Sequence, residues 1–134
     1  MPFFSTVQYL FAGNDTEGLR YGTIGTPEKF YLSWKEDVED QSRILLDKYL
    51  LKMCDKERFL EIIHDAVLFD AGIKKLPRVH QYFGLKAAQE NVNNYEGGII
   101  WHTQGSGKSI LMVILAKWIL ENHPNARIAI VTDR

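Results

Sequence analysis

A glycine-containing loop between two apolar segments constrains the fold of this 134-residue chain more than any other feature. Residues 98–101 form a short apolar run that is typical of a buried parallel strand. The loop 102–108 follows, and an apolar helical pattern then continues to about Glu121. Residues 127–132 form a second apolar run of the buried type. A strand, a loop, a helix and a strand in this order predict a right-handed parallel crossover and an α/β fold.

The composition of the loop predicts a phosphate-binding site. Gly105 and Gly107 permit backbone conformations that are closed to residues with a Cβ, so the loop N–H groups can converge on phosphate oxygens. The helix that follows adds the positive end of its dipole. Lys108 would reach the β- and γ-phosphates of ATP, and Ser109 would place its hydroxyl on Mg²⁺. The expected ATP-binding residues of the loop are Thr103, Gln104, Gly105, Ser106, Gly107, Lys108 and Ser109.

The loop departs from the general P-loop pattern at its first position. That pattern is G-x-x-x-x-G-K-[ST], and His102 stands where the first glycine is expected. A glycine-rich turn with an incidental lysine is therefore an alternative interpretation. The position of the loop, directly after an apolar strand and at the start of an apolar helix, favours nucleotide binding.

Residues 97–109 read Gly-Gly-Ile-Ile-Trp-His-Thr-Gln-Gly-Ser-Gly-Lys-Ser. They resemble motif I of the R subunit of type I restriction enzymes, a superfamily 2 helicase-like motor in which a histidine is usual at the place of His102. Residues 128–134 resemble the next motif of that family, where a strand ends in a DNA-contacting loop. Residues 78–83 resemble the segment ahead of motif I, and Gln81 matches the glutamine that reads adenine in related helicases.

The resemblance implies a domain organisation for the whole chain. It is strong over residues 78–134, which would be the N-terminal part of a RecA-like, ATP-binding motor lobe. It is weaker but collinear upstream, where residues 1–36 would be the last strands of a nuclease-like domain and residues 37–77 a helical linker.

The sequence upstream of the motor segment predicts small elements of both kinds. Strands are expected at 6–11, 19–24 and 30–34, and their many aromatic side chains are interpreted as sheet core rather than as a base-stacking platform. Two amphipathic helices are expected within residues 37–69, with Asp55 as the N-cap of the second. A linker is expected at 70–77, and the motor segment that follows is expected to begin with a helix that ends at residues 93–98.

Composition excludes several other classes of protein. The chain is 46% hydrophobic and 25% charged with a net charge of −1, which indicates a globular core and no general basic field for nucleic acid. Cys54 is the one cysteine, so no internal disulfide can form, and a reduced thiol fits the cytoplasm. No apolar run is long enough to span a bilayer. The histidines lack metal-ligand spacing, so only the Mg²⁺ that Ser109 would bind with ATP is expected.

The family resemblance also implies functions and partners. The full-length family cleaves and translocates double-stranded DNA and works with methyltransferase (M) and specificity (S) subunits. Its PD-(D/E)xK nuclease residues are expected upstream of Met1 and its acidic helicase motif downstream of the last residue. The expected function is thus ATP phosphate binding without hydrolysis or DNA cleavage. A non-catalytic remnant that binds partner proteins is the alternative, whereas a self-contained P-loop kinase is disfavoured because only one further strand follows the loop.

Overall fold

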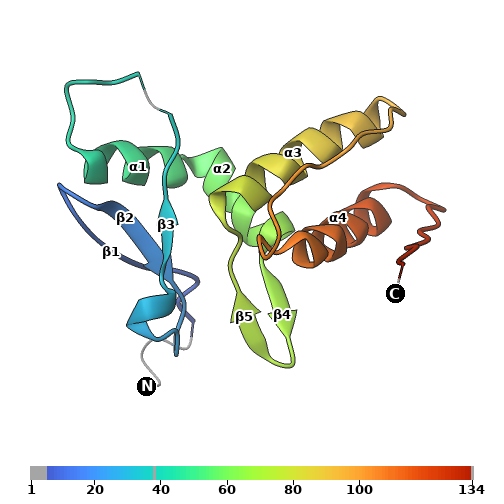
Figure 1. The fold of residues 1–134 in the computed structure, drawn as a ribbon, viewed down its shortest axis with the longest axis horizontal. Helices are drawn as coiled ribbons and strands as arrows, with labels where there is room; N and C mark the ends of the chain where they lie inside the picture. Colours follow the sequence, from blue (N-terminus) through green and yellow to red (C-terminus); the bar gives the residue numbers. More distant parts are fainter. Residues whose placement is uncertain (1–5, 38, 134) are drawn as a thin grey trace. The chain divides into compact units, whose positions relative to one another are not determined.

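The computed structural model describes residues 6–37 and 39–133 (Figure 1). The chain divides into two compact units, Met1–Tyr82 and Phe83–Arg134. The boundary between them falls inside helix α3 (Val79–Asn93). No helix in the described ranges is both long and apolar enough to cross a membrane.

The first unit begins with an antiparallel sheet in the order β1–β2–β3 (Figure 1). Its strands are β1 (Leu10–Asn14), β2 (Gly18–Gly22) and β3 (Leu32–Trp34). Three strands were predicted here, and three are present, although β1 lies later than residues 6–11. The reason is that β2 ends opposite Leu10 and the chain then turns, with the N–H of Thr26 donating to the carbonyl of Thr23 at 3.0 Å.

Aromatic side chains on one face of this sheet form the core of the first unit. Tyr21 and Trp34 are fully buried and meet edge to face at 6.0 Å between ring centroids. The hydroxyl of Tyr21 donates to the buried carbonyl of Pro77 at 2.5 Å, and burial raises the pKa of that hydroxyl, which keeps it protonated as a donor. The prediction of an aromatic sheet core is confirmed for Tyr9, Tyr21 and Trp34, whereas Phe11 and Phe30 are exposed and Phe3 and Phe4 lie outside the described residues. The buried cluster comprises Tyr9, Leu19, Tyr21, Trp34, Met53, Ile62, Val67 and Tyr82.

Two short helices follow the sheet, α1 (Leu45–Met53) and α2 (Lys56–Glu61). The carboxylate of Asp55 accepts from the N–H of Arg58 at 3.2 Å, which confirms Asp55 as the N-cap of α2. The helical region was predicted to begin near residue 37, but the first helix begins at Leu45. Val38 lies outside the described residues. Helical structure ends before residue 69, because a π-helical turn at Ile62–Ala66 leads into extended backbone at Val67.

The segment predicted to be a plain linker contains a β-hairpin. Strands β4 (Leu68–Asp70) and β5 (Ile73–Lys75) pair antiparallel, with Asp70 opposite Ile73. The two connecting residues both have positive φ, 48° at Ala71 and 80° at Gly72. Such a turn normally carries Asn or Asp before the glycine, so its alanine concealed the hairpin in the sequence.

A polar network joins the end of the sheet to three helices of the first unit. The guanidinium of Arg58 lies 2.7 Å from the carboxylate of Glu36, and both side chains are largely buried. Arg58 also lies over the ring of Tyr82, 5.7 Å from its centroid, and donates to the carbonyl of Lys52 at 3.2 Å. The hydroxyl of Tyr82 donates to Glu61 at 3.1 Å, and burial, together with the Glu61 carboxylate, raises the pKa of Tyr82 to about 12.

The second unit contains the rest of α3 and helix α4 (Lys108–Asn122), which starts where it was predicted to start. The strands expected at 98–101 and 127–132 are absent from residues 94–107 and 123–133, so the expected parallel crossover is not formed among the described residues. Strand pairing requires a neighbour in register, and these two segments do not pair with each other. Their apolar side chains are left in solvent, for example Trp101, which is 90% exposed.

Substitution Tyr21→Phe tests the role of the buried hydroxyl. Removal of the donor leaves the carbonyl of Pro77 buried without this hydrogen bond, and we expect a loss of about 1–3 kcal/mol in the free energy of unfolding. Urea unfolding monitored by tryptophan fluorescence measures the change. Tyr95→Phe is the matched control, because that ring is 94% exposed. Equal stability of both variants would contradict this account of the core.

Substitution Ala71→Asn tests the turn of the β4–β5 hairpin. Asparagine tolerates the left-handed conformation better than alanine, so we expect a gain of about 0.5–1 kcal/mol in stability. The β-branched variant Ala71→Val should change stability in the opposite direction. Thermal unfolding of the two variants provides the comparison, and a destabilised asparagine variant would show that the turn has another geometry.

Candidate phosphate-binding loop

The loop before α4 has the backbone geometry that the sequence predicts. Gly105 and Gly107 have φ values of 75° and 86°, in the left-handed region that favours glycine. A Cβ added at Gly105 would meet no atom within 4 Å, so the need for glycine there is conformational. Gly107 is the N-cap of α4, and its carbonyl accepts from the N–H groups of Ile110 at 3.1 Å and Leu111 at 3.2 Å.

The start of α4 offers N–H groups and positive charge to an anion. The first N–H groups of a helix have no partner within the helix, and α4 is long enough, at 15 residues, to have a full dipole. Lys108 and Ser109 are its first two residues, and both are exposed. Within this described helix, no acidic residue occupies the first turn, so no carboxylate competes there for the same groups.

The ammonium group of Lys108 is folded back over the loop. It donates to the carbonyl oxygens of His102 at 3.0 Å and Thr103 at 2.9 Å. The loop itself is closed by a bond of 3.3 Å from the N–H of Ser106 to the carbonyl of Thr103. An anionic oxygen entering the loop would therefore find the lysine already on its rim, held by weaker neutral acceptors that phosphate can replace.

The predicted loop residues differ in exposure. Thr103, Gln104 and Gly105 are exposed, Gly107 is half-buried and Ser106 is 7% exposed. No pattern in the sequence predicted the burial of Ser106. A buried serine inside an otherwise exposed loop indicates that this side chain shapes the loop, while the exposed backbone on either side remains accessible to a ligand.

Gln81 lies in the first unit and has a role that the sequence did not predict. It is 3% exposed, whereas a glutamine on an early helical turn is usually solvated. Its Oε1 accepts from the N–H of Arg78 at 2.8 Å, and the carbonyl of Arg78 accepts from the N–H of Tyr82 at 3.0 Å. Gln81 thus caps the N-terminus of α3 from the third helical position, as in half of a capping box.

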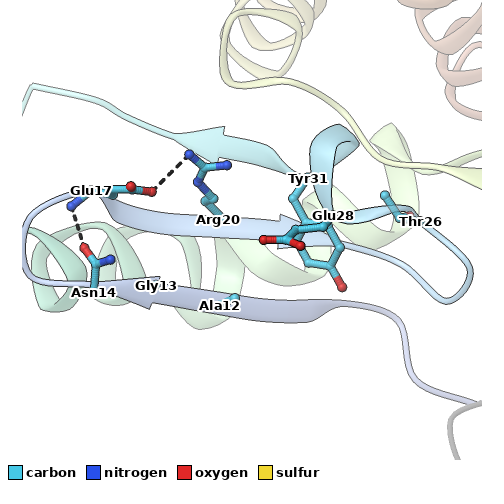
Figure 2. Close-up of a pocket in the computed structure, with 8 residues that line it drawn as sticks. All are labelled: Ala12, Gly13, Asn14, Glu17, Arg20, Thr26, Glu28 and Tyr31. Atoms are coloured by element: carbon cyan, nitrogen blue, oxygen red, sulfur yellow. Dashed lines mark hydrogen bonds and ion pairs between the residues drawn. The ribbon is translucent and has the colours of Figure 1, made fainter.

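A hollow of about 650 Å³ lies on the outer face of the β1–β2–β3 sheet, and none of the predicted site residues lines it (Figure 2). The guanidinium of Arg20, which lines the hollow, is paired with the carboxylate of Glu17 at 3.0 Å. The side chain of Asn14 accepts from the N–H of Glu17 at 2.7 Å, and Glu28 adds a second carboxylate to the lining. This balance of charge makes the hollow a poor site for phosphate. Among the described residues, no cluster of three His, Cys, Asp or Glu could hold a metal ion.

Comparisons with known proteins relate this chain to an ATPase family and to restriction enzymes. Residues 80–134, which include the loop and α4, match the family model of the SWI2/SNF2 ATPase. A type I restriction enzyme HindI endonuclease subunit from Haemophilus influenzae is 31% identical over 86% of this chain. A Methanocaldococcus jannaschii protein whose name assigns it to the endonuclease subunit of type I restriction enzyme MjaVIIIP is 32% identical over 91% of the chain.

The matched region is a small part of those relatives. The chain spans 13% of the length of each of the two proteins. The match runs through both compact units, because it covers most of the 134 residues. Over most of its own length, this chain is therefore a relative of the endonuclease subunits of type I restriction enzymes, with an ATPase-type segment at residues 80–134.

Proposed function

We propose that the loop 103–109 binds the phosphates of Mg²⁺–ATP and that the chain acts within the ATP-dependent, DNA-translocating and DNA-cleaving subunit of a type I restriction system. The observation that carries the proposal is the pair of left-handed glycines at the start of α4, within the segment that matches the SWI2/SNF2 ATPase. Such a turn directs backbone N–H groups and a helix N-terminus at one point, which suits phosphate.

Each loop residue has a proposed task. Gly105 and Gly107 give the backbone its curvature, and the N–H groups of the loop bind phosphate oxygens. Lys108 leaves the carbonyls of His102 and Thr103 and contacts the β- and γ-phosphates. The hydroxyl of Ser109 binds Mg²⁺. Gln81, by resemblance, would contact the adenine, with its rotamer fixed by the cap on Arg78.

A RecA-like lobe is part of the same proposal. In that lobe the apolar segments 98–101 and 127–132 would be parallel strands that pair with other strands of a larger sheet. The high exposure of Ile99, Trp101 and Val131, 90–94%, is in keeping with strands that lack neighbours here. The division into a nuclease-like segment 1–36, a linker 37–77 and a motor segment 78–134 also belongs to this proposal. Double-stranded DNA and the M and S subunits are the proposed partners.

The same exposed apolar side chains support a second candidate function. A polypeptide that binds partner proteins without any nucleotide activity would also present them to solvent. The two candidates differ in one measurable property, which is saturable binding of Mg²⁺–ATP through Lys108.

Substitution Lys108→Ala tests the proposed phosphate contact. We expect the purified 134-residue chain to bind Mg²⁺–ATP saturably in a calorimetric titration, and the variant to bind at least about tenfold more weakly, since one charge-assisted phosphate contact is lost. Lys117→Ala, on the same helix but paired with Glu121, is the control and should bind as the unaltered chain does. No binding by the unaltered chain would favour the partner-binding alternative.

Substitution Ser109→Ala tests the proposed Mg²⁺ contact. Titrations with ATP are compared in Mg²⁺ and in EDTA. We expect Mg²⁺ to strengthen binding to the unaltered chain but to have a much smaller effect on the variant, because the hydroxyl ligand is missing. An equal effect of Mg²⁺ on both proteins would remove Ser109 from the proposed site.

A further inference from the structure

Gly84 lies inside helix α3, where a glycine costs about 1 kcal/mol of stability relative to alanine. A Cβ built on Gly84 would lie 3.2 Å from Cε1 and 3.5 Å from Nε2 of the His102 imidazole. It would also lie 3.2 Å from Cδ2 of Leu111. The absent side chain therefore makes room for the histidine ring, which rests directly on the helix backbone.

His102, whose ring occupies this space beside Gly84, is the first residue of the phosphate-binding loop. The half-buried ring of His102 fills the space beside Gly84, and Leu111, only 2% exposed, closes the other side of that space. Leu111 belongs to the first turns of α4, and its N–H donates to the carbonyl of Gly107 at 3.2 Å. The imidazole is thus placed between α3 and the helix that the loop begins.

The backbone of His102 reaches the proposed phosphate-binding lysine. Its carbonyl accepts from the ammonium of Lys108 at 3.0 Å, and the carbonyl of Thr103 accepts from the same group at 2.9 Å. A movement of the His102 ring would move the peptide that holds Lys108. The general P-loop has glycine here, which has no side chain with which to anchor that peptide.

We propose that His102 is a positioning residue for nucleotide binding: its imidazole, seated on Gly84, fixes the first peptide of the loop and thereby the resting place of Lys108. The inference rests on the proposed function of the loop. A residue larger than glycine at position 84 would displace the ring. A loop displaced by about 0.5 Å or more presents its N–H groups poorly to phosphate.

Four single and double variants of the full chain test this role by calorimetric titration with Mg²⁺–ATP. Gly84→Ala adds one methyl group in the seat, and we expect about tenfold weaker binding. His102→Ala removes the ring, and binding should weaken severalfold. In the double variant, the added methyl group occupies the space that the imidazole has left, so Gly84→Ala should cause no further loss of affinity for Mg²⁺–ATP. Gly97→Ala is the control, because a Cβ there meets no atom within 4 Å.

The double-mutant comparison separates positioning from general damage. A helix gains intrinsic propensity when glycine becomes alanine, so loss of affinity without loss of helical circular dichroism identifies a local effect. If Gly84→Ala weakens binding equally with and without the imidazole, crowding of Leu111 explains the loss and the role of His102 is overturned. Should Gly84→Ala fail to fold, His102→Ala alone decides, since undiminished binding by that variant overturns the role.

The outcomes for the unaltered chain distinguish the two proposals. If the unaltered chain binds Mg²⁺–ATP and Gly84→Ala binds it with the same affinity, the positioning role is overturned, but the proposed phosphate-binding loop stands. No binding of Mg²⁺–ATP by the unaltered chain overturns the proposed function and the positioning role together.

Discussion

The backbone turn that starts α4 is the feature on which the candidate site of this chain depends. A helix begins with N–H groups that its own carbonyls cannot satisfy, and the preceding residues decide whether solvent, a side chain or a ligand meets them. Here Gly105 and Gly107 adopt left-handed φ, so the chain enters the helix without a capping side chain. Lys108 and Ser109 at the start of α4 are exposed, and the ammonium of Lys108 lies beside the loop. The proposed phosphate contacts of the loop follow from that geometry.

The first unit shows a different kind of constraint, since aromatic packing rather than backbone geometry organises it. Tyr21 and Trp34 are fully buried between the sheet and the helices, and the Tyr21 hydroxyl ties the sheet to Pro77, just ahead of α3. The Arg58 network makes a second connection from the sheet to the first turn of α3 through Tyr82. The start of α3 is thereby held by buried contacts, and Gln81 belongs to that held segment.

Local signals in the sequence predicted local structure well. The Asp55 cap, the start of α4 at Lys108 and the positive φ values of two loop glycines each follow from a few neighbouring residues, and each is present. Features that depend on distant partners were predicted less well, since the apolar segments 98–101 and 127–132 were predicted to be strands but lack a paired neighbour. The local β4–β5 hairpin was missed for another reason, because its turn carries Ala71 before the glycine. The cap that Gln81 places on α3 is local but lacked a Ser or Thr at the N-cap position to indicate it, and the contact of the Gly84 site with His102 and Leu111 depends on residues that are distant in the sequence.

The central claim is that phosphate binds to the backbone of the loop, and amide NMR tests it most directly. The ¹H–¹⁵N spectrum of the labelled chain would be recorded while Mg²⁺–ATP is added. The account predicts saturable shifts that are largest for the amides of residues 104–109, with Gly105 and Gly107 prominent among them. Shifts confined to other parts of the chain, or a spectrum that does not change, would contradict it.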